Sequence, residues 1–175
     1  KDKIVQCKLC PHFCVLKDNE LGKCMIRKNI DGRLYSFSYE KPVAVHIDPI
    51  EKKPLFNLIP GTNSYSIGMA GCNLKCEHCQ NWEISQKGAE EIPVPNVKAE
   101  EIVKFAIKAE CPSISYTFTE PLISCEYILD VAKIAKKNKI KNIIVSNGFI
   151  NPEPLKELCK YLDGANIDLK GNEKF

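Results

Sequence analysis

Strand-like and helix-like segments alternate along this chain from residue 64 to its end, and this alternation constrains the fold more than any other feature. Short runs rich in β-branched and small residues predict strands at 64–70, 113–118, 142–145 and 165–169. Apolar residues at helical spacing predict helices near 98–110, 121–138 and 152–161. Such alternation is typical of an α/β fold in which crossover helices join parallel strands. Because a closed barrel needs eight strands, we predict a partial (β/α) barrel whose C-terminal part is absent.

The part of the chain before this region has a different character. Residues 1 to about 30 hold a dense group of cysteines with little periodicity, and residues 33–47 read as extended. We therefore expect a small N-terminal cysteine-rich metal-binding module with an extended lead-in at 1–60, and a core of four strand–helix units at 61–175. The sequence begins without methionine and stops within the pattern, so we expect a longer parent protein.

The composition is that of an ordinary globular protein, with 44% hydrophobic and 27% charged residues. The net charge of +3 is too small and too dispersed to favour nucleic-acid binding. The sequence contains neither an apolar run near the roughly 18 residues of a membrane span nor a basic leader followed by an apolar stretch. A cytoplasmic protein without a membrane partner is therefore the expectation.

Three cysteines directly follow the first predicted strand with the spacing C-x3-C-x2-C; we call Cys72, Cys76 and Cys79 the cluster cysteines. Closed zinc sites and ordinary iron–sulfur clusters normally use four protein ligands. A set of three therefore indicates a [4Fe–4S] cluster with one iron left open to a small molecule. The alternative is a zinc site completed by His78 or by a distant ligand, although His78 fits better beside a cofactor.

Polar residues also follow the other three predicted strands, namely Glu120, then Ser146 and Asn147, then Asp168 and Lys170. Each has an ordinary explanation when taken alone: an acid at a helix start, a turn, and surface charges. Ligands of parallel α/β folds, however, bind at the carboxyl ends of the strands. The shared position of these residues therefore favours one site that includes the cluster cysteines.

Four more cysteines lie near the N-terminus with two, three and nine residues between them; these N-terminal cysteines are Cys7, Cys10, Cys14 and Cys24. Four thiolates can close a tetrahedral site, and a short loop-rich segment is hard to stabilise without one. Structural zinc, an auxiliary iron–sulfur cluster and unligated or redox thiols all stay open, with Cys10-Pro11 favouring the cluster. His12 is expected at the surface. The isolated cysteines are expected to be small buried hydrophobes: Cys111, Cys125 and Cys159.

With these residues placed, the chain resembles the radical S-adenosylmethionine (radical SAM) superfamily, whose motif has the spacing of the cluster cysteines. Activating enzymes of the pyruvate formate-lyase type are the nearest likeness, carried by Cys79-Gln80-Asn81, Thr119-Glu120-Pro121, Asn147-Gly148 and Asp168-Leu169-Lys170. The stretches 7–14 and 42–55 resemble the AmmeMemoRadiSam subgroup. Val145 stands where the activating enzymes carry an aspartate, which argues against a monovalent-cation site.

The resemblance implies a role for each site residue. The cluster cysteines would hold three irons of a [4Fe–4S] cluster, and S-adenosylmethionine would chelate the fourth through its amino and carboxylate groups. Glu120 would accept a hydrogen bond from the methionyl ammonium, while Ser146 and Asn147 would lie near the ribose and carboxylate. Asp168 and Lys170 would complete the pocket. The backbone around His78 and Asn81 would meet the adenine.

The resemblance also implies the reaction. The reduced cluster would cleave S-adenosylmethionine to methionine and a 5′-deoxyadenosyl radical that abstracts hydrogen from a substrate. Flavodoxin or ferredoxin would supply the electron, and the substrate class includes a partner protein activated by formation of a glycyl radical. The alternative is a zinc-stabilised binding module without redox chemistry, which would carry zinc at both cysteine groups.

Overall fold

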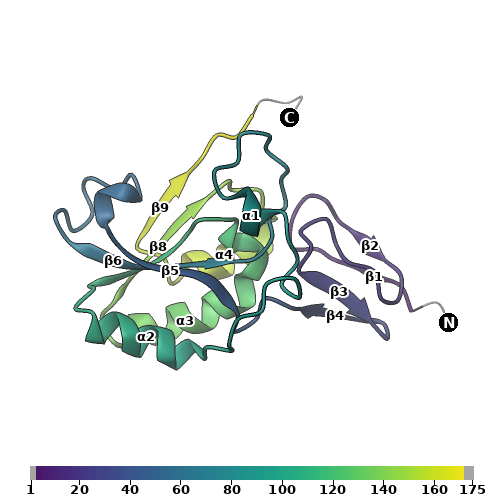
Figure 1. The fold of residues 1–175 in the computed structure, drawn as a ribbon, viewed down its shortest axis with the longest axis horizontal. Helices are drawn as coiled ribbons and strands as arrows, with labels where there is room; N and C mark the ends of the chain where they lie inside the picture. Colours follow the sequence, from purple (N-terminus) through teal and green to yellow (C-terminus); the bar gives the residue numbers. More distant parts are fainter. Residues whose placement is uncertain (1–2, 172–175) are drawn as a thin grey trace.

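The computed structural model describes residues 3–171, and a five-stranded sheet forms its centre (Figure 1). The strands lie side by side in the order β5 (Pro42–Pro49), β6 (Asn63–Met69), β7 (Ser113–Tyr116), β8 (Lys141–Ser146) and β9 (Gly164–Ile167). Strands β6 to β9 are parallel to one another, and β5 is antiparallel to β6. The predicted α/β class and the four parallel strands are therefore confirmed.

The helices follow the strands as the alternation predicts. They are α1 (Trp82–Ser85), α2 (Ala99–Lys108), η2 (Pro121–Ser124), α3 (Cys125–Lys137) and α4 (Pro152–Cys159), with the 3-10 helix η1 (Ile50–Lys52) after β5. The sequence predicted one helix from residue 121, whereas the structure has a 3-10 turn before α3. Pro121 stands at the first position of that turn, and the Glu120 side chain accepts a hydrogen bond from the Leu122 N–H.

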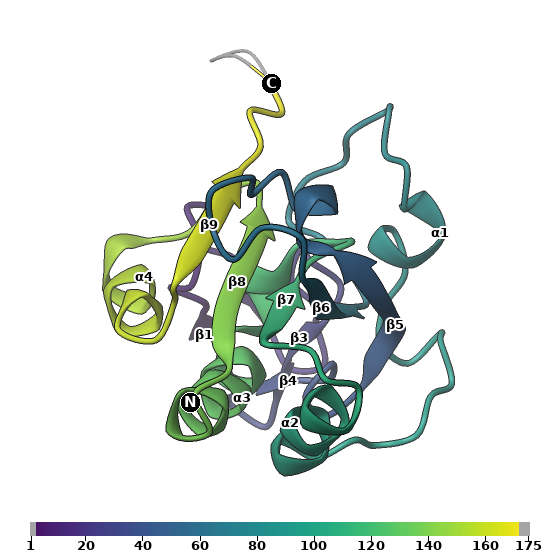
Figure 2. The same cartoon turned by 90° about the vertical axis from the view of Figure 1, so that its left-hand side faces the viewer.

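One face of the sheet and the helices enclose the main hydrophobic core. In β6 the side chains of Tyr65, Ile67 and Met69 belong to this core, together with residues of α2, α3 and α4. Figure 2 shows the strands in order from β9 to β5 with α2, α3 and α4 outside the sheet. The alternate residues of β6 therefore face the opposite side, as the period of two in a strand requires.

Serines occupy that opposite face, and the segment after β5 covers them. Ser64 and Ser115 are fully buried, and their hydroxyl oxygens lie 2.6 Å apart. The covering segment approaches the sheet as far as β9, because a Cβ added to Gly164 would lie 2.7 Å from Leu58 Cδ2. A strand face lined by small polar residues thus faces a loop of the same chain rather than a helix layer.

Strand β5 changes the expectation for the lead-in. The sequence predicted only extended structure there, but β5 pairs with β6 from Pro42 opposite Met69 to Pro49 opposite Asn63. The sheet therefore begins before the boundary predicted at residue 60. Antiparallel pairing is available because the connection from β5 to β6 returns the chain alongside itself, without a crossover helix.

The N-terminal segment lies beside one end of the sheet and consists of two antiparallel pairs (Figure 1). Strand β1 (Val5–Gln6) pairs with β2 (Val15–Leu16), and β3 (Arg27–Ile30) pairs with β4 (Arg33–Ser36). The buried Arg27 guanidinium donates to the Ile123 carbonyl oxygen from Nε at 3.1 Å and from Nη2 at 2.9 Å. It also forms two hydrogen bonds to the Glu126 carboxylate, which fasten the segment to η2 and α3.

The isolated cysteines differ in burial. Cys111 and Cys125 are buried as predicted, but Cys159 is exposed, so that prediction was wrong. Cys159 is the last residue of α4, whose buried residue is Leu158 on the neighbouring helix position. Separately, no helix within residues 3–171 combines the length and apolar character needed to cross a membrane.

Candidate functional site

A cavity of about 620 Å³ opens at the carboxyl ends of the parallel strands. All ten residues predicted for the cofactor site line it: Cys72, Cys76, His78, Cys79, Asn81, Glu120, Ser146, Asn147, Asp168 and Lys170. The volume lies within the roughly 300–1,000 Å³ of small-molecule sites. The parallel topology therefore brings residues separated by almost a hundred positions to one place.

The loop of the cluster cysteines leaves β6 through Gly71, whose φ of +84° suits a residue without Cβ. Two groups of the chain approach the sulfur atoms. The Leu74 N–H donates to Cys72 Sγ at 3.4 Å, and the Ser85 hydroxyl lies 3.2 Å from Cys79 Sγ. Such polar neighbours orient a thiolate ligand and stabilise its charge.

Burial raises the pKa of the Cys72 thiol to about 12, more than the Leu74 N–H lowers it. The nearby Glu120 carboxylate and the other cluster cysteines raise it further. The thiol is therefore protonated in the metal-free chain, and a metal that binds Cys72 must displace the proton. Within residues 3–171, no three His, Cys, Asp or Glu side chains stand in metal-binding geometry, so ligation requires the cysteine side chains to rotate.

Glu120 is 1% exposed, and three hydrogen bonds hold its carboxylate. Oε1 accepts from the Leu122 N–H at 2.9 Å and from the Ser146 hydroxyl at 2.7 Å. Oε2 accepts from the Asn147 N–H at 2.8 Å. Burial raises the pKa of this carboxyl, while the three donors and the Lys170 charge oppose the shift. Glu120 thus ties the end of β7 to the end of β8 and also faces the cavity.

Asn147 connects the end of β8 to the loop of the cluster cysteines. Its side-chain amide donates to Asn73 Oδ1 at 2.9 Å and lies 4.0 Å from Cys72 Sγ. The buried Asn73 in turn donates to the Phe149 carbonyl oxygen at 2.8 Å. Residues after β8 therefore fix the position of the loop next to its first cysteine.

The end of β9 contributes a pair of opposite charges to the cavity. Lys170 Nζ donates to Asp168 Oδ2 at 2.9 Å, and the other carboxylate oxygen accepts from the Asn166 amide at 2.7 Å. The hydrogen bond to Asp168 raises the pKa of Lys170, against a smaller lowering by burial. Both side chains are about one-third exposed, so they stand at the mouth of the cavity rather than in its interior.

His78 lies within the loop of the cluster cysteines, and Asn81 lies between the last of these cysteines and α1. His78 is exposed, and within residues 3–171 it belongs to no group of side chains in metal-binding geometry. Asn81 precedes α1, and its amide donates to the Phe118 carbonyl oxygen at 2.5 Å. Phe118 adopts a φ of +70° between the two threonines that precede Glu120, so Asn81 holds a backbone turn that most residues avoid.

Three residues at the end of β5 and just after it also reach the cavity, and the sequence alone did not predict them: Asp48, Lys52 and Lys53. Lys53 has a side chain only 4% exposed, and its Nζ donates to Asp48 Oδ2 at 2.8 Å. Its Nζ also lies 5.1 Å from the centre of the Phe118 ring. The run of charges at 48–53 was a visible signal, but only the pairing of β5 with β6 shows where it lies.

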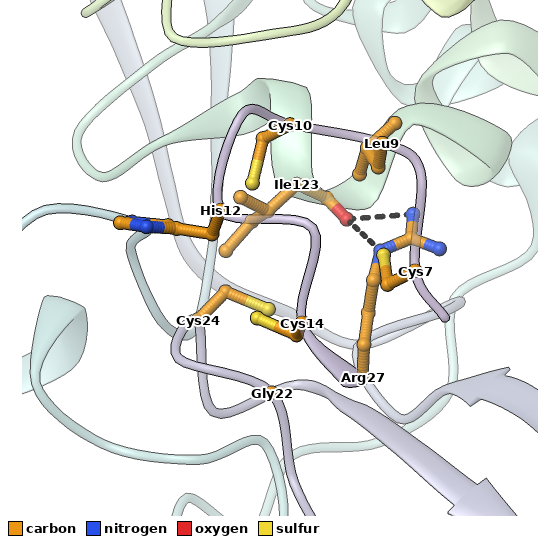
Figure 3. Close-up of a pocket in the computed structure, with 9 residues that line it drawn as sticks. All are labelled: Cys7, Leu9, Cys10, His12, Cys14, Gly22, Cys24, Arg27 and Ile123. Carbon is orange, nitrogen blue, oxygen red and sulfur yellow. Dashed lines mark hydrogen bonds between the residues drawn. The ribbon is translucent and has the colours of Figure 1, made fainter. Parts of the chain in front are cut away.

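The N-terminal cysteines surround a second, much smaller cavity beside Arg27 and Ile123 (Figure 3). The thiols of Cys14 and Cys24 point toward each other in Figure 3. Burial raises the pKa of Cys10 and Cys24, although backbone N–H groups act in the opposite direction. His12, expected at the surface, is half-buried, and its Nε2 donates to the Asn73 carbonyl oxygen at 2.7 Å.

The sequence model of the Radical SAM superfamily matches residues 66–174, which include the end of the first parallel strand, the cluster cysteines and the other strand ends described above. This chain belongs to the radical SAM superfamily. Membership implies an enzyme that uses a [4Fe–4S] cluster, S-adenosylmethionine and a reductant.

Several proteins of methanogens are similar to this radical SAM chain. An uncharacterized protein of Methanocaldococcus jannaschii is 48% identical over 174 residues, which are 99% of this chain and 52% of that protein. A 7-carboxy-7-deazaguanine synthase of the same organism is 29% identical, covering 70% of this chain and 56% of the synthase. The synthase of Methanothermobacter thermautotrophicus is 27% identical, covering 67% and 46%. The chain thus spans about half the length of these relatives.

The residues present fit the cofactors that the family implies. Three soft thiol donors face a cavity large enough for a small organic ligand, and soft sulfur ligands suit iron–sulfur clusters. The rest of the cavity wall offers a carboxylate, amides, a hydroxyl and a lysine, which complement a zwitterionic ligand with a ribose.

Proposed function

We propose that this chain is the cofactor-binding portion of a radical SAM enzyme, with the cluster cysteines as its metal ligands. The observation that carries the proposal is the convergence on one cavity of three thiols and the polar ends of β7, β8 and β9. When both cofactors are bound, one-electron reduction of the cluster supplies a 5′-deoxyadenosyl radical for hydrogen abstraction from a substrate.

The chain's own residues have separate tasks in this proposal. The Leu74 N–H and the Ser85 hydroxyl orient the thiolates of Cys72 and Cys79. Asn147 holds the loop through Asn73 and presents the rest of its amide to the cavity. These groups already stand beside the cluster cysteines, so the rearrangement that ligation requires is that of the cysteine side chains.

Glu120 serves mainly as the support of this site and secondarily as an acceptor. Three donors of the chain already occupy its carboxylate, which leaves one acceptor position on Oε2 toward the ligand. A methionyl ammonium bound there would form a charge-assisted hydrogen bond. Asp168 and Lys170 close the mouth, and the backbone near His78 and Asn81 borders the space assigned to adenine.

The substrate is proposed more broadly. The motifs shared with activating enzymes favour a partner protein whose glycine loses a hydrogen, with flavodoxin or ferredoxin as electron donor, in the AmmeMemoRadiSam subgroup. The two relatives named 7-carboxy-7-deazaguanine synthase favour a small molecule instead. A substrate cavity shared with the rest of a longer protein would suit either substrate class. We also propose the division into a module at 1–60, which contributes β5 to the central sheet, and a core at 61–175.

The test is cofactor cleavage by the anaerobically reconstituted chain. With dithionite as reductant, we expect a brown protein that converts S-adenosylmethionine to 5′-deoxyadenosine and methionine. Cys76→Ala is expected to abolish cleavage, whereas Cys159→Ala, which removes an exposed thiol outside both cysteine groups, is expected to retain it. Cleavage by Cys76→Ala at the wild-type rate would contradict the proposal. A colourless protein with zinc and no acid-labile sulfide at the cluster cysteines would support the rival binding module.

A further inference from the structure

The N-terminal cysteines line a small cavity of about 10 Å³. Its other lining residues are Leu9, His12, Gly22, Arg27 and Ile123, and no carboxylate is among them (Figure 3). Three of the four cysteines are buried and the fourth, Cys14, is half-buried. Four thiols thus line one small cavity, outside the residues 66–174 that the family model matches and outside the site of the proposed function.

The volume of this cavity distinguishes between the possible occupants. About 10–15 Å³ by this measure is the space of one water molecule, so the space between the four thiols matches a single metal ion, which binds once the cysteine side chains rotate toward it. A four-iron cube is much larger than this space. Four cysteines without an open position are also the ligand set of structural zinc. We propose that the N-terminal cysteines bind one zinc ion as a closed tetrathiolate site.

Zinc binding at the N-terminal cysteines needs neither an oxidant nor a reductant. Four neutral thiols and one Zn²⁺ give a tetrathiolate complex of charge −2, and four protons pass to solvent. The buried Arg27 guanidinium lines the same cavity and offsets part of that charge. Since the Glu126 carboxylate and the Ile123 carbonyl oxygen hold it in place, this cation is positioned before the metal binds.

The segment that carries the zinc ligands also contacts the loop of the cluster cysteines. His12, between Cys10 and Cys14, donates to the Asn73 carbonyl oxygen and stacks edge-on against Phe149. At Gly71, an added Cβ would collide with the carbonyl oxygen of Cys24, the last zinc ligand. Zinc binding therefore also positions the backbone on both sides of Cys72.

Two hydrogen bonds extend this contact to the start of α4. The Leu9 carbonyl oxygen accepts from the Asn151 N–H at 2.9 Å, and the Lys8 carbonyl oxygen accepts from the Asn151 amide at 2.7 Å. Lys8 and Leu9 lie between the first two ligands, so their backbone is fixed once zinc is bound. The zinc ion thus has a structural role: it holds the N-terminal segment in place against the loop of the cluster cysteines and the start of α4.

The metal content of the chain purified without reconstitution tests the first part. The protein to analyse is a variant whose three cluster cysteines are alanine. We expect it to hold about one zinc per chain and neither iron nor acid-labile sulfide. The double variant Cys10→Ala/Cys14→Ala should lose that zinc, whereas the matched control Cys125→Ala, which removes a buried thiol outside both groups, should keep it. Iron and sulfide at the N-terminal cysteines, or no metal there, would overturn the proposal.

Replacement of zinc by cobalt keeps the proposal testable if the double variant does not fold. Co²⁺ bound by four thiolates in a tetrahedron should give intense ligand-field and sulfur-to-cobalt absorption, and octahedral or absent bands would contradict a tetrathiolate site. For the second part, removal of zinc by a chelator should speed amide hydrogen exchange at 71–76 and 147–151 in the cluster-cysteine variant. Faster exchange confined to residues 5–30 would refute the claim that zinc positions the loop of the cluster cysteines. Neither readout depends on cofactor cleavage, so this proposal and the proposed function can fail separately.

Discussion

Glu120→Gln is expected to destabilise the fold before any ligand is considered. The variant keeps one acceptor oxygen, which can serve the Leu122 N–H and the Ser146 hydroxyl, but its amide nitrogen then faces the Asn147 N–H. The change removes one charged hydrogen bond and leaves two buried donors opposed. A hydrogen bond to a charged group contributes about 1.5–3 kcal/mol and a buried unpaired group costs about 1–3 kcal/mol, so the loss is about 2.5–6 kcal/mol.

Relief of the buried charge works in the opposite direction, because burial alone raises the pKa of Glu120. We therefore expect the lower half of that range, about 2.5–4 kcal/mol, which for a chain of this size lowers Tm by about 5–16 °C. Urea unfolding of the metal-free protein measures the free energy, and Ser146→Ala is the matched control. It removes one of the three donors and leaves the carboxylate, so it should cost only about 1 kcal/mol. A Glu120→Gln variant as stable as the wild type would refute the bracing role.

Three further predictions concern the surroundings of the site. Burial alone would raise the pKa of Asp48, but pairing with Lys53 lowers it below its ordinary value of 3.8. The pair therefore stabilises the fold above about pH 4, and this stabilisation is lost as the pH falls through the lowered pKa. Asp48→Asn should therefore cost about 3 kcal/mol at pH 7 and reduce the acid sensitivity of urea unfolding below pH 4; an unchanged pH profile would contradict the pairing. Gly71→Ala should cost more than about 4 kcal/mol, since its Cβ meets the Cys24 carbonyl oxygen at a positive φ, and a soluble, equally stable variant would refute that contact. Asn73→Ala should cost about 1–3 kcal/mol and slow iron incorporation into the cluster; normal incorporation would show that Asn73 does not fix the loop.

The sequence predicted the parallel part of the fold because each of its elements has a local signal. The apolar spacing of Ile102 and Ala106 defines the inner face of α2, and Pro152 marks the start of α4. The predicted site followed from topology, since parallel strands necessarily place the residues after their carboxyl ends on one edge of the sheet. No contact between Glu120 and Asn147 had to be known for that inference.

The features that escaped prediction depend on contacts between distant segments. Strand β5 has the extended pattern, but only its antiparallel pairing to β6 places Asp48 and Lys53 at the cavity. Similarly, nothing in the sequence around Glu120 indicates that two of its hydrogen-bond donors come from β8 and the residue after it. The attachment of His12 to Asn73 spans 61 positions and has no local signature.

The central claim is that the three cluster cysteines leave one iron free for the amino and carboxylate groups of S-adenosylmethionine. Electron–nuclear double resonance of the reduced, reconstituted cluster measures this directly, with ¹⁵N and ¹⁷O labels in the methionyl group of the cofactor. The account predicts hyperfine coupling of the cluster electron to both labels in the wild type. A reduced [4Fe–4S] cluster that shows no coupling to either label, under conditions in which the cofactor is bound, would contradict it.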